Sequence, residues 1–145
     1  MENYVKEYNI ERNDIGNAGT VASLTKRALK KRGLSREFVK RVTIGVYEAE
    51  INVVIHSYGG KVIVEINDTF IRVTYKDEGP GIPNIEKALT KGYSTASPYA
   101  IENGFGAGMG LPNIQAVSDN MTLESSEEGT LLCIRFNITE DCYAS

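Results

Sequence analysis

Long apolar runs are missing from this sequence, and cysteine and histidine are scarce. No run approaches the roughly 18 apolar residues that a membrane-spanning helix needs. The N-terminus is acidic and amphipathic, so it is unlike a secretory signal. The two cysteines, Cys133 and Cys142, are interpreted as free thiols in a reducing cytoplasm. We therefore expect a cytoplasmic protein with no membrane partner.

An excess of positive charge is also missing. The chain has 16 Lys and Arg residues against 19 Asp and Glu residues, which gives a formal net charge of −3. Domains that bind nucleic acids are usually strongly basic, so no nucleic-acid partner is expected. The 145 residues fit one domain, residues 1–145, and 41% hydrophobic with 24% charged residues is typical of soluble globular proteins.

Hydrophobic periodicity predicts two N-terminal helices and a strand-rich second half. Helical spacing runs over residues 18–29 and 39–53, and Asn13 and Asp14 are candidate caps for the first helix. Asn67 and Asp68 are expected to form a hairpin turn. Strands are expected at 3–10, 62–66, 71–77, 121–125 and 130–138, and short helices at 85–89 and 111–117. This element order favours a two-layer α/β sandwich.

The first motif with chemical potential is EAEIN, in the second helix. Glu48 and Asn52 lie four residues apart and share one face, whereas Glu50 should point roughly the opposite way. A carboxylate can accept a proton or orient a hydroxyl group, and an Asn oxygen is a hard ligand suited to Mg²⁺. The same pattern also fits a solvated helix face, and the single histidine, His56, is interpreted as a helix-end or surface residue.

The second motif is DEGPGI, at the end of a strand. Asp77 shares strand parity with core residues, and a carboxylate at the end of a buried face needs hydrogen-bond donors or must become neutral. The exocyclic amine of a purine could be such a donor. Gly79 and Gly81 would let the backbone approach a planar ligand closely. The alternative interpretation is a tight turn capped by an aspartate.

The third motif is GFGAGMGL, in which four glycines alternate before a helix. Such a run exposes backbone N–H groups at a helix N-terminus, where phosphates bind. It is not a P-loop, because the lysine of that motif is missing, and its spacing differs from the dinucleotide fingerprint. A flexible loop is the alternative, but each glycine costs conformational entropy on folding.

Together, and in this order, the three motifs resemble the Bergerat-fold (GHKL) ATPase superfamily. The segments DEGPGIPNIEKALTKGYSTAS and GFGAGMGLPNIQAVSD are similar to bacterial anti-sigma-factor serine kinases, and especially to the switch kinase of the stress-signalling complex. The resemblance runs from about Thr20 to Ile138. It implies a mixed, mostly antiparallel sheet with helices packed on one face, and an ATP-dependent serine kinase that uses Mg²⁺.

The resemblance also implies residue roles. Asn52 matches the Mg²⁺-binding asparagine, Glu48 the glutamate that activates the attacking hydroxyl, and Asp77 the aspartate that binds adenine. Thr130 matches a threonine that supports adenine through water. The glycine motifs and the residue that follows them would bind the cofactor ATP: Gly79, Gly81, Gly104, Gly106, Gly108, Gly110 and Leu111.

The implied substrate is a STAS-domain protein. Further candidate partners are a sigma factor, a downstream phosphatase and a second copy of the chain. The sequence departs from the family pattern at two places, which concern the γ-phosphate contact and the binding of a sigma factor. Residues 97–103 form an insertion without Lys or Arg, which leaves Lys91 as the nearest candidate for a cation on the γ-phosphate. Gly19 replaces an arginine that sigma-binding members use.

Three alternative functions remain. The chain could be a nucleotide-gated anti-sigma or activator module with little turnover. It could be a detached sensor-kinase domain, although this would need a partner chain to carry the phosphoacceptor. A hydrolytic motor is the least favoured interpretation.

Overall fold

A computed structural model describes residues 2–79, 89 and 110–145 of the chain. Several features expected from the sequence lie outside the described residues. They are the helix at 85–89 apart from Leu89, the segment 97–103, and the residues Gly81, Lys91, Gly104, Gly106 and Gly108.

Five strands form one sheet in the described part of the chain, in the order β1-β2-β3-β5-β4. Every neighbouring pair is antiparallel, so the expected mostly antiparallel sheet is confirmed. The predicted turn between β2 and β3 is also present, because the side-chain oxygen of Asn67 accepts from the backbone N–H groups of Thr69 and Phe70. The strands are β1 (Tyr4–Glu11), β2 (Gly59–Ile66), β3 (Phe70–Asp77), β4 (Asn120–Ser126) and β5 (Gly129–Asn137).

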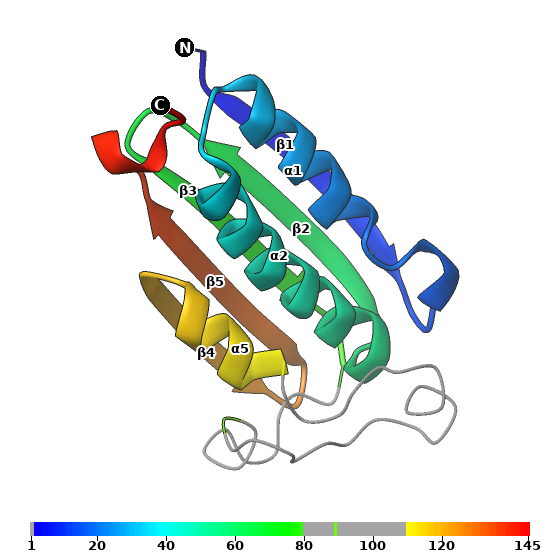
Figure 1. The fold of residues 1–145 in the computed structure, drawn as a ribbon. Coiled ribbons are helices and arrows are strands. Elements are labelled where there is room, and N and C mark those ends of the chain that lie inside the picture. The colour runs from blue at the N-terminus through cyan, green and yellow to red at the C-terminus, as the bar shows by residue number, and fades with distance from the viewer. Residues whose placement is uncertain (1, 80–88, 90–109) are drawn as a thin grey trace.

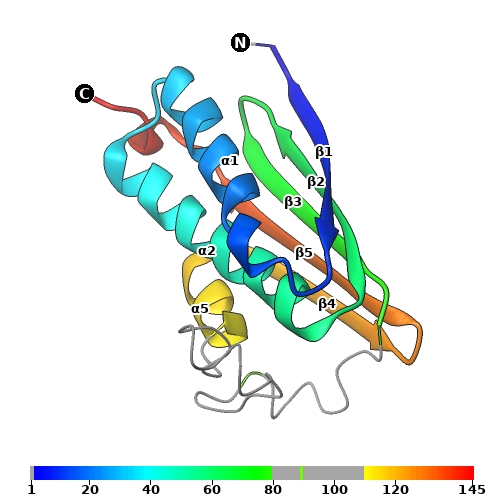
Figure 2. The ribbon, with the colours of Figure 1, turned by 90° about the vertical axis from the view of Figure 1, so that its right-hand side faces the viewer.

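The helices cover one face of this sheet, as Figures 1 and 2 show from two directions. They are α1 (Thr20–Lys31), α2 (Arg36–His56) and α5 (Gly110–Val117), with short 3-10 helices η1 (Ile15–Asn17) and η2 (Glu140–Cys142). The predicted two-layer sandwich is therefore confirmed. Among the described residues, no helix is both long and apolar enough to cross a membrane.

The core lies between α2 and the inner faces of the central strands. Apolar residues alternate along these strands and recur at helical spacing along α2, which is the pattern that places one face of each element against the other. The Tyr75 hydroxyl donates to the carbonyl of Val46 at 2.9 Å and so ties β3 to α2. Fully or almost fully buried residues include Val39, Val42, Val46, Ala49, Val62, Val64, Ile71, Val73, Tyr75, Ile134 and Phe136. Burial of one such side chain stabilises the fold by about 1.5–3 kcal/mol.

The start of α1 differs from the prediction. Asn13 and Asp14 precede η1, and α1 begins only at Thr20, with Gly19 at the N-cap and a φ of 96°. This left-handed conformation favours glycine. No side chain from the N-cap position itself bonds to the helix end. The cap comes from α2 instead, as described below.

Candidate functional site

Three elements come together at one end of the sheet. Figure 1 shows there the last turns of α2, the end of β3 and the start of α5. The backbone N–H of Tyr58, just after α2, donates to the carbonyl of Glu78 at 2.7 Å. The N–H of Gly79 donates to the carbonyl of Glu128, in the turn before β5, at 3.3 Å. A Cβ at Gly79 would lie 3.3 Å from the Cα of Ser57. Gly79 therefore lies tightly between α2 and the β4–β5 turn.

Asp77 is the last residue of β3 and is half-buried on the face that carries the helices. Its Oδ1 accepts the backbone N–H of Thr130 at 2.9 Å. Burial raises the pKa of Asp77, and the hydrogen bond from Thr130 offsets this only in part. Its Oδ2 has no hydrogen-bond partner among the residues that the structure describes. One oxygen is thus fixed and the other can accept a donor from a ligand.

Thr130 meets Asp77 through its backbone and not through its side chain. The Thr130 hydroxyl lies 3.0 Å from the hydroxyl of Ser125 on β4. The backbone can come so close because Gly129 precedes it with a φ of 153°, and a Cβ at Gly129 would overlap the carbonyl oxygen of Asp77. Thr130 is therefore next to Asp77, with the main chain making the contact.

Glu48 and Asn52 lie together on one face of α2, as their spacing predicts, and this face meets the first residue of α5. A Cβ at Gly110 would lie 3.5 Å from Asn52 Oδ1 and 3.7 Å from Glu48 Oε2. Any side chain at position 110 would occupy the space in front of both groups. The Asn52 side chain and Glu48 Oε2 have no hydrogen-bond partner within the described part of the chain. Two oxygen ligands are thus available beside a helix N-terminus.

Asn113, on α5, contributes to this site and was not predicted. Its Nδ2 donates to Glu48 Oε1 at 3.4 Å. The bond holds one oxygen of the carboxylate and leaves Oε2 facing Gly110. No local motif marks Asn113, which follows Leu111 by two residues in a short helix. It could have been predicted only from the face that α5 turns toward α2.

Leu111, the second residue of α5, has a buried side chain. Its side chain is 5% exposed and belongs to the hydrophobic core. Any contact between Leu111 and a ligand must therefore come from its backbone, at the second residue of α5. Its apolar side chain anchors the start of the helix, which holds Gly110 next to Asn52.

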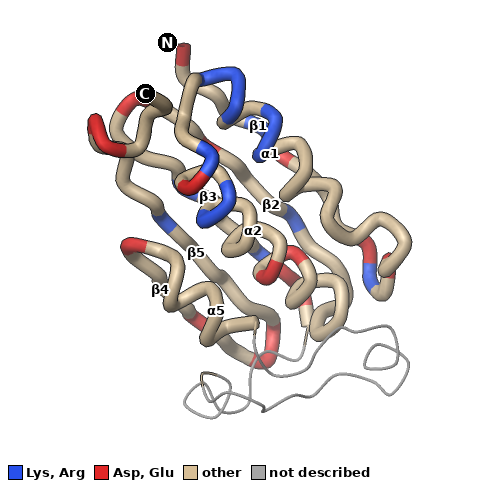
Figure 3. The backbone as a smooth tube through the Cα atoms, in the orientation of Figure 1, with Lys and Arg blue, Asp and Glu red and all other residues tan. Residues whose placement is uncertain are grey.

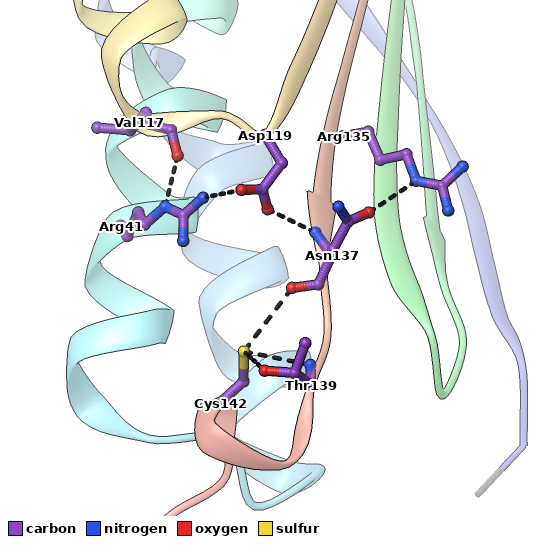
Figure 4. A network of polar contacts seen from close by, with 7 residues as sticks. All are labelled: Arg41, Val117, Asp119, Arg135, Asn137, Thr139 and Cys142. Carbon is purple, nitrogen blue, oxygen red and sulfur yellow. Dashed lines mark hydrogen bonds and ion pairs between the residues drawn. The ribbon is translucent and has the colours of Figure 1, made fainter.

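The other end of α5 is held by a network of polar contacts (Figure 4). The Nε of Arg41, on α2, donates to the carbonyl of Val117, and its Nη2 pairs with Asp119 Oδ1 at 2.8 Å. Asp119 Oδ2 in turn accepts the backbone N–H of Asn137 on β5 at 2.7 Å. A cation at a helix C-terminus also interacts favourably with the helix dipole. Both ends of α5 are therefore fixed by α2.

Glu50 points away from Glu48, as predicted, but it is a structural residue. It is 2% exposed and accepts the backbone N–H groups of Gly19, Val21 and Ala22 at 3.0–3.2 Å. Burial raises the pKa of Glu50, while the N–H bonds act in the opposite direction. Glu50 thus supplies the N-terminal cap that α1 lacks locally. His56, the last residue of α2, has a pKa lowered by burial.

The arrangement suits a nucleotide with a hard metal ion. Asn52 Oδ1 and Glu48 Oε2 are oxygen ligands of the kind that Mg²⁺ prefers. The start of α5 at Gly110 lies beside them, and the N-terminus of a helix favours phosphate through its dipole and its N–H groups. Asp77 Oδ2, which no described residue bonds, lies near the C-terminal end of α2. Ser57, which Gly79 approaches just after Asp77, marks the Asp77 end of the site. Asn52 precedes Ser57 by five residues, which is roughly 7–8 Å of helix. One ligand can therefore reach both Asp77 with its adenine and Asn52 with its phosphates.

Comparisons with known proteins identify the family of the chain. Residues 12–136 match the family described as the histidine kinase-like ATPase domain. The serine/threonine-protein kinase RsbT of Bacillus subtilis (strain 168) is 27% identical over 112 residues, which cover 74% of this chain and 78% of that relative. The anti-sigma F factor of Clostridium acetobutylicum is 34% identical over 113 residues, which cover 72% of this chain and 76% of that relative.

A solved structure is similar over nearly the whole chain. The structure of the RsbU and RsbW domains of Rv1364c from Mycobacterium tuberculosis covers 98% of this chain with a TM-score of 0.65 and 15% identity, and this chain spans 35% of that one. At this identity the likeness shows the fold alone. The family match and the 34% identity go further: the chain belongs to the histidine kinase-like ATPase family, in the group that contains the anti-sigma factors and their related serine kinases.

Proposed function

We propose that the chain is an ATP-dependent protein serine kinase of a bacterial partner-switching pathway. Its substrate is a serine of a STAS-domain protein, and phosphorylation of that protein regulates a sigma factor. The observation that carries the proposal is the position of Gly110, whose Cβ would lie within 3.7 Å of both Asn52 Oδ1 and Glu48 Oε2. A metal ligand and a candidate base thus face the same point at a helix N-terminus.

In this proposal the nucleotide extends along the C-terminal half of α2. Asp77 Oδ2 accepts a hydrogen bond from the exocyclic amine of adenine, while Oδ1 keeps its hydrogen bond from the Thr130 N–H. The N-terminus of α5 faces the triphosphate. Asn52 holds Mg²⁺, which when bound neutralises charge on the phosphate oxygens.

Glu48 acts on the substrate serine. Its Oε1 is held by Asn113, and its Oε2 accepts the hydroxyl hydrogen as the serine oxygen forms a bond to the γ-phosphorus. The bond from the γ-phosphorus to the bridging oxygen breaks, and ADP leaves with that electron pair. Such a transfer depends mainly on positioning and charge stabilisation, which a small domain can provide.

The test is single-turnover phosphorylation of a STAS-domain protein with labelled ATP. Glu48→Gln should keep ATP affinity within a few-fold and slow transfer by about 10²–10⁴-fold, because the amide retains the shape but cannot take the proton. Glu37→Gln, an exposed change in the first turn of the same helix, is the matched control and should leave the rate unchanged. Glu50 is unsuitable as a control because it caps α1. Equal rates for Glu48→Gln and the wild type would refute the role of Glu48.

A second candidate is a nucleotide-gated binding module with little turnover. The insertion at residues 97–103 carries no Lys or Arg, which favours this candidate because a cation usually stabilises the transferred phosphoryl group. Gly19, in place of the expected arginine, weighs against direct sigma-factor binding in either case. If the wild type binds ATP tightly but transfers no phosphate to STAS-domain proteins, the module becomes the better description.

A further inference from the structure

A cavity opens between the start of β1 and the last turns of α1, with a volume of about 570 Å³. Its apolar lining comes from Tyr4 on β1 and from Leu24 and Ala28, one turn apart on α1. Arg27 and Lys31, also one turn apart, lie alongside. We refer to these residues, with Arg32, as the β1–α1 groove. Its volume is within the range of about 300–1,000 Å³ that is usual for ligand pockets.

Positive charge is concentrated at this groove, whose lining contains three basic residues and one acidic residue, Glu2. Five of the seven residues from Lys26 to Arg32 are Lys or Arg, although the whole chain has a net charge of −3. Figure 3 shows the blue segments of α1 gathered on its last turns, near the N-terminus of the chain. Among the described residues, no ion-pair partner is present for Lys26, Arg27, Lys30 or Lys31.

Arg32 is different, because its role is structural. Its guanidinium donates to the carbonyl of Glu2 at 2.7 Å and pairs with Asp68 at 3.1 Å, and its side chain is 8% exposed. It therefore holds Glu2, which also lines the groove, next to the end of α1. The helix dipole accounts for cations in the last turn of α1, such as Lys30 and Lys31. It does not account for the apolar cavity beside them.

The groove is separate from the nucleotide site. Tyr4 pairs with Ile66 at one end of β2, whereas Asp77 pairs with Gly60 at the other end. Gly60 and Ile66 are six residues apart on β2, which is about 20 Å along the strand. A ligand in the groove therefore cannot be part of the nucleotide, and a variant in the groove should not disturb Asp77.

We propose that the β1–α1 groove docks an acidic segment of a partner protein. One apolar side chain of that segment enters the cavity between Leu24, Ala28 and Tyr4, and flanking carboxylates pair with Arg27 and Lys31. A membrane surface fits less well, because here the apolar groups line a hollow and do not protrude. The net negative charge of the chain disfavours nucleic acid. The proposal does not depend on kinase activity.

The experiment measures fluorescence anisotropy of a fluorescein-labelled peptide in which glutamates flank a central pair of leucines. A second peptide has serines in place of the leucines. The full chain is compared with Lys31→Glu and Arg27→Glu, which reverse charge at the groove, and with Ala28→Phe, which fills the cavity without a change of charge. Lys40→Glu, at an exposed position of α2, is the control for charge reversal.

The wild type should bind the leucine peptide, and Lys31→Glu and Arg27→Glu should each weaken binding by about tenfold at low salt and reduce its salt dependence. Ala28→Phe should weaken binding at every salt concentration, and Lys40→Glu should have little effect. Three results would overturn the proposal: no binding by the wild type, equal affinity for the two peptides, or equal binding by Lys31→Glu and Lys40→Glu. Groove-dependent binding of phosphatidylserine vesicles or single-stranded DNA, without peptide binding, would also overturn it. Because Arg27 and Lys31 are exposed, their variants remain informative if Ala28→Phe does not fold.

Discussion

Replacement of Asp77 by Asn should weaken ATP binding and, at the same time, stabilise the free protein. In the wild type, Oδ1 is occupied by the Thr130 N–H, and Oδ2 has no partner in the part of the chain that the structure describes. The Asn amide keeps one acceptor and gains a donor. In either orientation of the amide, its NH₂ faces another donor, which is the Thr130 N–H or the amine of adenine. The loss of one hydrogen bond to a charged group costs about 1.5–3 kcal/mol, or roughly 10- to 100-fold in affinity.

The effect on stability has the opposite sign. Burial raises the pKa of Asp77 above its ordinary value of 3.8, so the folded state disfavours the ionised carboxylate. This destabilisation begins as the pH rises above the ordinary value, and it is complete once the pH exceeds the raised pKa. The amide of Asp77→Asn carries no charge, so the variant without nucleotide should melt at a higher temperature than the wild type at neutral pH. The difference should disappear in acid, where the wild-type carboxyl group is protonated as well.

Titration calorimetry with ATP and GTP, and thermal melts at acidic and neutral pH, measure both effects. GTP carries an oxygen where ATP carries the amine, so the preference for ATP over GTP should also fall in the variant. Asp141→Asn, an exposed change in η2, is the matched control and should alter neither quantity. Unchanged ATP affinity would remove Asp77 from the adenine role. A lower melting temperature for Asp77→Asn at neutral pH would contradict the interpretation of its pKa.

Three further predictions concern residues around the site. Asn113→Ala should slow phosphate transfer by about tenfold with little change in ATP affinity, because the Glu48 carboxylate then loses the bond that orients it. In a Glu48→Gln background the Asn113→Ala change should have no further effect on the rate, and additive losses would contradict the orienting role of Asn113. Arg41→Ala should weaken ATP binding by about tenfold, because α5 becomes less ordered. The affinity of Arg41→Lys should lie between those of the wild type and Arg41→Ala, since a lysine cannot bond to Val117 and Asp119 in the same geometry. Equal ATP affinities of all three proteins by calorimetry would refute the anchoring role of Arg41. Glu50→Gln should lower the free energy of unfolding in urea by about 1–3 kcal/mol, because both carboxylate oxygens of Glu50 accept N–H groups of α1 and the amide must turn its NH₂ toward one of these donors. This loss outweighs the gain from removing a charge whose burial raises the pKa of Glu50, and an unchanged midpoint would show that the cap contributes little.

Local patterns were sufficient for most of the secondary structure. The alternation of Val62, Val64 and Ile66 and the helical stripe that contains Val42 and Val46 each predict the buried face that the structure has. These patterns work because one face of each element is apolar and the other is polar. The spacing of Glu48 and Asn52 predicts a shared face for the same geometric reason.

The residues that join elements could not be predicted in this way. Asn13 and Asp14 looked like caps because nearby Asn and Asp side chains often bond to a helix N-terminus. The actual cap, Glu50, follows Gly19 by 31 residues, and nothing in the local sequence of α1 points to it. Asn113 and Arg41 are of the same kind, since each makes its main contact across the boundary between α2 and α5. Such contacts depend on the packing of whole elements.

The position of α5 shows what this dependence means for the site. An isolated helix of eight residues is too short to be stable in water, since about 12–15 residues are needed. Pro112 costs α5 little, because the first N–H groups of a helix have no partner within it. The helix is held through α2, by Arg41 at one end and by Asn113 near the other. Close approach of the two helices requires Gly45, because a Cβ there would lie 3.2 Å from the Val117 side chain and 2.8 Å from the Phe136 ring. The distance from Glu48 and Asn52 to the N-terminus of α5 is therefore set by packing in the interior of the α2–α5 pair, so a glycine packed against Val117 and Phe136 helps to fix this end of the proposed nucleotide site.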